Sequence, residues 1–177
     1  MKKHGSLIKL IALFILATFY FASIPTVHSS GKEKQVVGWV EVVTLLPENL
    51  QVKAKLDTGA RNSSLNATNI VEFKRQGETF VRFELTNWKG RVETKEAQVI
   101  RVAKIKQHNS EPEHRPVVRI GLCLGNISKQ VEVNLVNRSN FNYPMLIGRS
   151  FLKGDFVIDP ARTYTVPANC RKFVRDE

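Results

Sequence analysis

Apolar and polar residues alternate in short runs along most of this chain, from residue 36 to residue 166. Alternation with a period of two is typical of β-strands that have one buried face. A single short helix is expected near residues 150–153, where Gly154 would end it. The pattern predicts an all-β fold, namely a single-domain closed β-barrel with one short helix. The predicted strands span residues 36–46, 50–56, 70–74, 79–85, 98–105, 117–124, 130–136, 156–158 and 164–166.

The first 29 residues differ from the rest of the chain. Lys2 and Lys3 give a basic start, residues 7–24 are mostly apolar, and small or polar residues follow Pro25. This order predicts a secretory signal peptide over residues 1–29. An uncleaved membrane anchor is the alternative, although a spanning helix usually needs about 20 apolar residues. We therefore expect an exported protein, either periplasmic or anchored to the inner membrane and facing the periplasm.

The remaining sequence predicts a linker at residues 30–36, a folded domain at residues 37–168 and a tail at residues 169–177. The chain carries 27 basic and 16 acidic residues, a net charge of +11. These basic residues are scattered and are not interleaved with aromatic residues, so we do not expect nucleic acid as a partner. The two cysteines either pair with each other in an oxidising compartment or leave Cys123 as a small buried hydrophobe, with Cys170 in the tail.

Candidate chemistry begins at Asp57-Thr58-Gly59-Ala60, directly after the alternating run at residues 52–56. The run places a carboxylate at the end of a strand, where a glycine permits a tight turn and a close approach by another chain. There is one such site, and a catalytic pair of carboxylates needs two. If the protein is an aspartic peptidase, the second carboxylate must come from another copy of the chain. The alternative is a turn carboxylate that caps local backbone N–H groups.

A second element lies near the C-terminal end, where Leu146 and Ile147 precede Gly148 and the start of the predicted helix. Together, in this order, the two elements resemble the retropepsins, single-domain aspartic peptidases typified by the retroviral proteases. The resemblance is sharpest to a bacterial retropepsin-like family once labelled ATP-dependent zinc proteases, and it covers about residues 37–166. The segments that carry it are Gly38-Trp39, Lys53-Ala54-Lys55-Leu56-Asp57-Thr58-Gly59-Ala60-Arg61, Ser64-Leu65-Asn66-Ala67, Arg115-Pro116-Val117, Leu135-Val136-Asn137-Arg138, Met145-Leu146-Ile147-Gly148-Arg149 and Asp159-Pro160-Ala161-Arg162.

The resemblance implies an aspartic endopeptidase in which two catalytic carboxylates, one from each chain of a homodimer, activate a water molecule. The implied substrate is a peptide or protein. The catalytic residue would be Asp57, in a loop completed by Thr58, Gly59 and Ala60, with Leu146, Ile147, Gly148 and Arg149 supporting this loop and lining the cleft.

No cofactor or metal is expected. The chain lacks a Gly-rich phosphate loop that ends in Gly-Lys-Ser/Thr, and it lacks His-Glu-x-x-His. Its folded domain has two histidines, His108 and His114, whereas catalytic zinc usually has three protein ligands. Two alternatives stay open: a non-catalytic module that binds an extended peptide by strand addition, and, less favoured, a zinc peptidase.

A polar segment is the candidate for the flap that covers the cleft of a retropepsin. It lies at residues 104–116, where Pro112 and Pro116 are expected to disfavour regular strand pairing. We expect it to close over bound peptide; the alternative cover is the earlier hairpin around Gln76 and Gly77. The candidate flap residues are Gln107, His108, Asn109, Ser110 and Glu111.

One position departs from the retroviral pattern. There, an acid follows the alanine of the catalytic loop and pairs with the arginine of the second element. Here that position is Arg61, which cannot pair with Arg149. Asp155 or Asp159 is expected to take the place of the missing acid.

Overall fold

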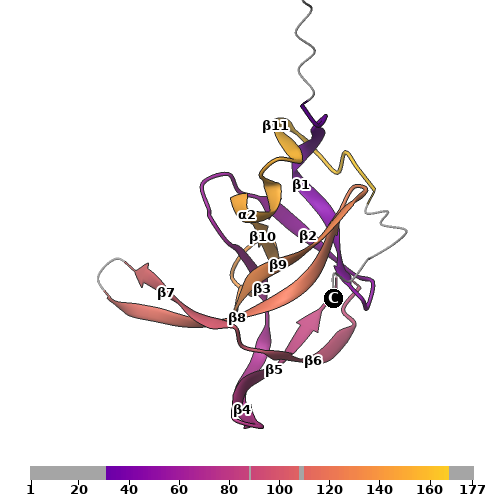
Figure 1. Cartoon of the computed structure of the whole chain (residues 1–177). Coiled ribbons are helices and arrows are strands. Elements are labelled where there is room, and N and C mark those ends of the chain that lie inside the picture. Colours follow the sequence, from indigo (N-terminus) through magenta and orange to yellow (C-terminus); the bar gives the residue numbers. More distant parts are fainter. Residues whose placement is uncertain (1–30, 88, 108–109, 168–177) are drawn as a thin grey trace, which may run out of the picture. The chain divides into compact units, whose positions relative to one another are not determined.

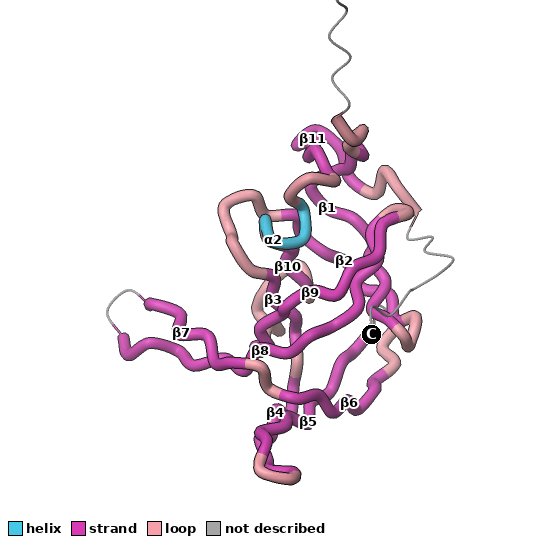
Figure 2. Tube along the Cα trace, in the orientation of Figure 1, coloured by secondary structure: helices cyan, strands magenta, loops and turns pink. Residues whose placement is uncertain are grey.

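The alternating sequence runs form β-strands in the computed structural model, which describes residues 31–87, 89–107 and 110–167 (Figure 1). The chain divides into Met1–Lys32 and a larger unit, Glu33–Glu177, whose described residues carry the fold. Its helix, α2, is a single short turn (Figure 2). The elements are β1 (Gln35–Leu46), β2 (Leu50–Leu56), β3 (Ser63–Asn66), β4 (Thr68–Arg75), β5 (Glu78–Thr86), β6 (Val92–Gln98), β7 (Arg101–Gln107), β8 (Ser110–Leu124), β9 (Ile127–Val136), β10 (Met145–Ile147), α2 (Arg149–Leu152) and β11 (Phe156–Thr163).

The strands form two sheets. An eight-stranded sheet has the order β11-β1-β2-β10-β3-β9-β8-β7, and a three-stranded sheet has the order β4-β5-β6. Within the larger sheet, β1 also pairs with β8, so two strands that are not neighbours in this order are hydrogen-bonded as well. The expected all-β, single-domain fold with one short helix is confirmed, while the closed barrel stays a prediction.

The alternation of apolar and polar residues determines which side chains form the core. In β2, the residues alternate between buried and exposed from Leu50 to Leu56, so one face of the strand packs into the core. Apolar residues of β10 and α2 join the same cluster, among them Ile147 and Phe151. Burial of a large apolar side chain stabilises the fold by about 1.5–3 kcal/mol. The strand that carries the candidate acid is therefore anchored along one face.

A buried carboxylate ties the end of the fold to β1. Glu41 is fully buried. Its carboxylate accepts hydrogen bonds from the backbone N–H of Gly38 at 2.7 Å and from the backbone N–H and hydroxyl of Thr165 at 2.9 and 2.6 Å. Buried polar groups need such partners because desolvation without them is costly. Glu41 thus fixes the segment that follows β11 against the first strand.

Substituting Glu41 with glutamine should lower the free energy of unfolding by roughly 2 kcal/mol. The amide keeps the shape of the side chain, but its NH₂ group would face donors that now point at an oxygen. Urea denaturation followed by circular dichroism measures the change. Glu72→Gln, on an exposed position of β4, is the matched control and should shift stability by less than about 0.5 kcal/mol. Equal stability of the Glu41→Gln and Glu72→Gln variants would contradict the assigned role.

Several expected strands differ from those observed. The sequence did not predict β3 or β6, and residues 164–166, expected as a strand, lie beyond the end of β11. Tyr164 has φ +53°, which ends the extended conformation. The strand expected at residues 156–158 instead continues through Pro160 to Thr163, on the edge of the sheet, where a proline is tolerated.

The described residues of the candidate flap form a β-hairpin that reaches away from the rest of the sheet (Figure 1). The expectation that its prolines disfavour regular pairing is wrong for Pro116, which pairs in register with Val102. Nearer the tip, the register shifts between Ile105 and Gln107, opposite the segment that contains Pro112. Up to residue 116, β8 has β7 as its strand partner, and its pairing with β9 begins at Val117. A strand with one free edge accommodates prolines. Closure over a peptide stays a prediction.

The remaining sequence expectations concern the ends of the chain. Residues 1–30 and Cys170 lie outside the described residues, so the signal peptide stays a prediction. Cys123 is buried and disulfide-bonded. No helix in the part of the chain that the structure describes combines the length and the hydropathy needed to cross a membrane.

Candidate active site

Asp57 lies immediately after β2, at the point where this strand meets β10. Its backbone N–H donates to the carbonyl oxygen of Ile147 at 2.8 Å. One carboxylate oxygen, Oδ1, accepts hydrogen bonds from the N–H groups of Gly59 at 2.9 Å and Ala60 at 3.2 Å. The other, Oδ2, lies 3.9 Å from Nζ of Lys55, and the side chain is 27% exposed. Asp57 therefore caps its own turn with one carboxylate oxygen, while its side chain stays partly exposed.

The start of α2 holds the loop that carries Asp57. The N–H groups of Arg149 and Ser150 donate to the carbonyl oxygens of Ala60 and Arg61 at 2.9 and 3.0 Å. Gly148 packs so closely on this loop that a Cβ atom there would lie 2.6 Å from the carbonyl oxygen of Asn62. The two elements that the sequence singled out are thus in direct backbone contact.

The guanidinium of Arg149 also binds the Asp57 loop. One of its nitrogens donates to the carbonyl oxygens of Thr58 and Gly59 at 2.7 and 2.8 Å. The expectation that Asp155 or Asp159 pairs with Arg149 is wrong: Asp155 pairs with Lys129, and the carboxylate of Asp159 accepts a hydrogen bond from the N–H of Ala161. Carbonyl oxygens of the loop therefore replace the carboxylate partner found in retroviral proteases.

Asp57 opens onto a pocket of about 490 Å³. Its walls combine apolar and aromatic residues with cationic ones, and Trp39 meets Tyr143 edge to face with ring centroids 5.8 Å apart. Of the expected cleft residues, Leu146 lines this pocket, whereas Ile147 is buried in the core. The residues that line the pocket are Trp39, Lys55, Asp57, Arg138, Phe141, Asn142, Tyr143 and Leu146.

The sequence had predicted no role for most of the residues that line this pocket. Trp39, Lys55 and Arg138 fall in segments that carried the family resemblance, and this was the available signal. Residues 141–143 gave no such sequence signal, because they belong to the irregular connection between β9 and β10.

The other predicted residues occupy different places. Thr58 and Arg149 line a second pocket, of about 450 Å³, together with the β11 residues Phe156 and Ile158. Glu111 is exposed, and His108 and Asn109 lie outside the described residues. Among the described residues, no group of three or more histidine, cysteine, aspartate or glutamate side chains is placed to hold a metal ion.

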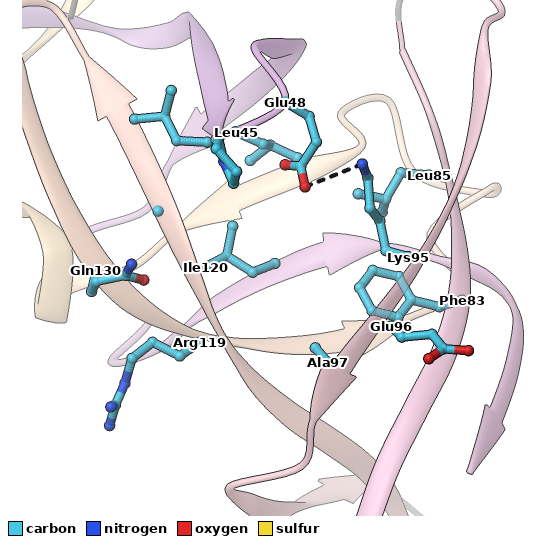
Figure 3. A pocket seen from close by; sticks show the side chains of 13 residues that line it. Leu45, Glu48, Phe83, Leu85, Lys95, Glu96, Ala97, Arg119, Ile120 and Gln130 are labelled. Carbon is cyan, nitrogen blue, oxygen red and sulfur yellow. Dashed lines mark ion pairs between the residues drawn. The ribbon is translucent and has the colours of Figure 1, made fainter. Parts of the chain in front are cut away.

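A third pocket, of about 380 Å³, lies between β1, β8 and the three-stranded sheet (Figure 3). Apolar side chains such as Leu45 and Phe83 line it, and Lys95 on its wall pairs with Glu48 at 3.2 Å. Burial opposes the charged form of Lys95, but its hydrogen bonds to Glu93 and Glu48 leave the pKa of Lys95 raised. None of the candidate active-site residues lines this pocket.

The fold and the site define a class: a single-lobe, retropepsin-like domain that presents one Asp-Thr-Gly loop at the junction of β2 and β10. The RimB-like family model, described as "Retropepsin-like aspartic endopeptidase RimB", matches residues 36–169. The chain therefore belongs to the RimB-like family. The predicted resemblance to retropepsin-like bacterial proteins is confirmed.

Other comparisons find longer relatives and similarity to a solved structure. The chain is 38% identical over 116 residues to a "Probable alpha-L-glutamate ligase" of Shewanella pealeana (strain ATCC 700345 / ANG-SQ1), covering 64% of this chain and 25% of that protein. It is 37% identical over 112 residues to a protein of the same name from Parasynechococcus marenigrum (strain WH8102), covering 62% and 24%. The chain thus spans about a quarter of the length of these curated relatives. The crystal structure of Lpg0085 from Legionella pneumophila, a protein with unknown function, superposes with a TM-score of 0.65 at 36% identity and covers 75% of this chain and 98% of that one.

Proposed function

We propose that this protein is an aspartic endopeptidase whose active site combines two Asp57 carboxylates, one from each chain of a homodimer. The observation that carries the proposal is the setting of Asp57. Its carboxylate is hydrogen-bonded within its own turn, is partly exposed and lines a pocket, and β10 and α2 hold its loop by backbone hydrogen bonds. A turn acid with a purely structural role needs neither the clamp nor the pocket.

Two such carboxylates about 3 Å apart cannot both ionise cheaply, so they would share one proton. The ionised carboxylate would take a proton from a water molecule as that water attacks the peptide carbonyl carbon. The protonated carboxylate would donate its proton to the carbonyl oxygen. The carbonyl carbon gains a bond to the water oxygen as the C=O double bond becomes a single bond, which gives a tetrahedral intermediate. The carboxylate that took the proton from water would then give it to the amide nitrogen, the C–N bond would break, and the amine half of the peptide would leave.

We propose that the second copy binds at the exposed tip of the Asp57 loop. Thr58 and Gly59, at the tip of the loop, are exposed in the single chain. Arg149 fixes their carbonyl oxygens from the side, so the tip keeps one shape without a partner. A preformed tip lowers the ordering cost of association. We propose that Thr58 forms hydrogen bonds with the matching loop of the partner.

The names of the longer relatives do not oppose this proposal. They describe proteins of which this chain matches about a quarter. We propose that the matched quarter is a peptidase-like domain and that the ligase activity which those names give belongs to the other parts of those proteins.

The experiment is a cleavage assay with a peptide library, run from acidic to neutral pH over a wide range of protein concentration. We expect cleavage products, and activity per chain that falls on dilution because the dimer dissociates. Sedimentation should show the dimer over the same concentrations. Full activity per chain in a strictly monomeric solution would refute the shared site.

A non-catalytic peptide-binding module is the second candidate. The observation that favours it is that one chain holds a single Asp-Thr-Gly site beside a well-formed pocket. Peptide binding without any cleavage, at every pH and concentration tested, would select this candidate.

A further inference from the structure

The pocket between β1, β8 and the three-stranded sheet, here called the Figure 3 pocket, has mainly apolar walls. Leu45 of β1 and Phe83 and Leu85 of β5 are among its lining residues, and all three are buried. Its volume of about 380 Å³ is near the lower end of the ~300–1,000 Å³ of ligand pockets, which suits one or two side chains. Contact between water and apolar walls is unfavourable, so the pocket favours an apolar occupant.

The last described residues of the chain lie beside the middle of β1. The N–H of Tyr164 donates to the carbonyl oxygen of Val40 at 2.8 Å, and the N–H of Thr165 donates to the buried carboxylate of Glu41 at 2.9 Å. Val166 packs against the core cluster. Residues 168–177 follow and lie outside the described residues. This C-terminal segment therefore starts close to Glu41.

A disulfide bond indicates the direction in which the segment continues. Cys123 of β8 is buried and disulfide-bonded, and the sequence contains one other cysteine, Cys170. Cys123 lies opposite Thr44, which is farther along β1 than Glu41 by about 10 Å of strand. The chain from Thr165 to Cys170 can span up to about 17 Å when extended, so it reaches this point. A bond between the two cysteines would lead the segment along β1 from Glu41 to Thr44.

The Figure 3 pocket begins next to this disulfide. Leu45 follows Thr44 directly on β1, and Gly121 precedes Cys123 by two residues on β8; Leu45 and Gly121 both line the pocket. Residues 171–177, which follow Cys170, span up to about 23 Å when extended. This length is enough to enter the pocket from the disulfide.

The sequence of residues 171–177, Arg-Lys-Phe-Val-Arg-Asp-Glu, matches the chemistry of the pocket. Phe173 and Val174 suit its apolar walls. The flanking charges of both signs suit its polar residues, which include the carboxylate of Glu48 and the guanidinium of Arg119. A short tether also gives a segment a local concentration of about millimolar, so that even modest contacts with the pocket favour docking.

We propose that residues 171–177 dock into the Figure 3 pocket, where Phe173 and Val174 pack against its apolar walls, and that a bond between Cys123 and Cys170 tethers them there. The pocket is thus a docking site for the chain's own C-terminal segment. The inference is independent of the proposed peptidase function, because none of the candidate active-site residues lines this pocket.

Fluorine NMR of the full chain, with 4-fluorophenylalanine in place of Phe173, tests the docking. We expect a resonance that differs from that of a free peptide with the sequence of residues 168–177 and the same label. Ala97→Phe, which places a larger side chain in the pocket, should move the resonance to the free-peptide position. The matched control carries the label at Phe141, which is exposed and lines the Asp57 pocket instead, and its resonance should not respond to Ala97→Phe.

Two further variants alter the segment and leave the walls of the pocket unchanged. Val174→Asp should release the labelled Phe173, because a carboxylate does not enter an apolar pocket without a partner. This variant decides the question if Ala97→Phe does not fold. Cys170→Ser should also move the Phe173 resonance toward the free-peptide position, because loss of the tether lowers the local concentration of the segment.

Several outcomes would overturn the proposal. A Phe173 resonance at the free-peptide position, in the chain that carries the label alone, would leave the pocket to another occupant. A shift that disappears on dilution would assign the pocket to the C-terminal segment of a second copy. A shift that survives both Ala97→Phe and Val174→Asp would place Phe173 on a different surface, and a resonance that stays in place in Cys170→Ser would refute the tether.

Discussion

Asp57→Asn should reduce kcat at least about a thousandfold, in the range that a positioned proton donor and acceptor contributes. The amide oxygen can still accept the hydrogen bonds from Gly59 and Ala60 that hold the turn. What the amide cannot do is ionise or exchange the shared proton. The measurement is kcat on the best peptide from the library, with urea denaturation alongside to show that the fold persists.

Asp159→Asn is the matched control. The Asp159 carboxylate also caps a backbone N–H two residues on, and Asp159 does not line the Asp57 pocket. It should therefore leave kcat unchanged. Mixing the Asp57→Asn chain with wild type should lower activity further than dilution alone, because mixed dimers hold one competent carboxylate. Turnover that survives Asp57→Asn would assign the chemistry to another residue.

The sequence was most informative where a regular pattern met a distinctive residue. The alternation in β2 predicted both the strand and the place of Asp57 at its end. Leu146-Ile147-Gly148-Arg149 predicted the crossing element, and the structure shows its backbone bonded to the Asp57 loop. These inferences succeeded because strand period and close backbone approach are local requirements that one chain segment displays by itself.

The sequence was less informative wherever the role of a residue depends on a distant segment. Nothing local distinguishes Arg138 from an exposed arginine; its burial depends on Ser64 and Tyr143, which other elements supply. The partner of Arg149 was missed for a similar reason. Every residue has a backbone carbonyl oxygen, so the residue types around a side chain do not show that it binds such oxygens.

The prolines of the flap show another reason why strands cannot always be predicted from sequence. A proline disfavours a strand that has neighbours on both sides, but the sequence does not tell which strands have a free edge. Pro116 lies in a part of β8 that pairs with β7, before its pairing with β9 begins. Edge position is a property of the assembled sheet, so strand assignment at Pro112 and Pro116 required the structure.

Gly148→Ala should lower the free energy of unfolding by about 2 kcal/mol or more, the scale of a forced overpacking, and should abolish turnover. Gly148 has φ −92° and ψ 176°, an extended conformation that alanine adopts without strain, so the effect comes from collision alone. The added Cβ would lie 2.6 Å from the carbonyl oxygen of Asn62 and 2.8 Å from the carbonyl carbon of Arg61. Urea denaturation and kcat, measured where the variant is still folded, test both effects.

The expected loss of turnover in Gly148→Ala follows from which backbone atoms the added Cβ would displace. The atoms in collision belong to the backbone of the loop that carries Asp57, so either this loop or the start of α2 must shift, and the bonds from Arg149 and Ser150 to the loop are disturbed with it. Gly77→Ala is the control: at φ +84° in the exposed β4–β5 turn it strains the backbone but meets no atom within 4 Å. It should cost about 1 kcal/mol and leave kcat unchanged. If Gly148→Ala matched it in both measurements, the close crossing of the two elements would not be what positions Asp57.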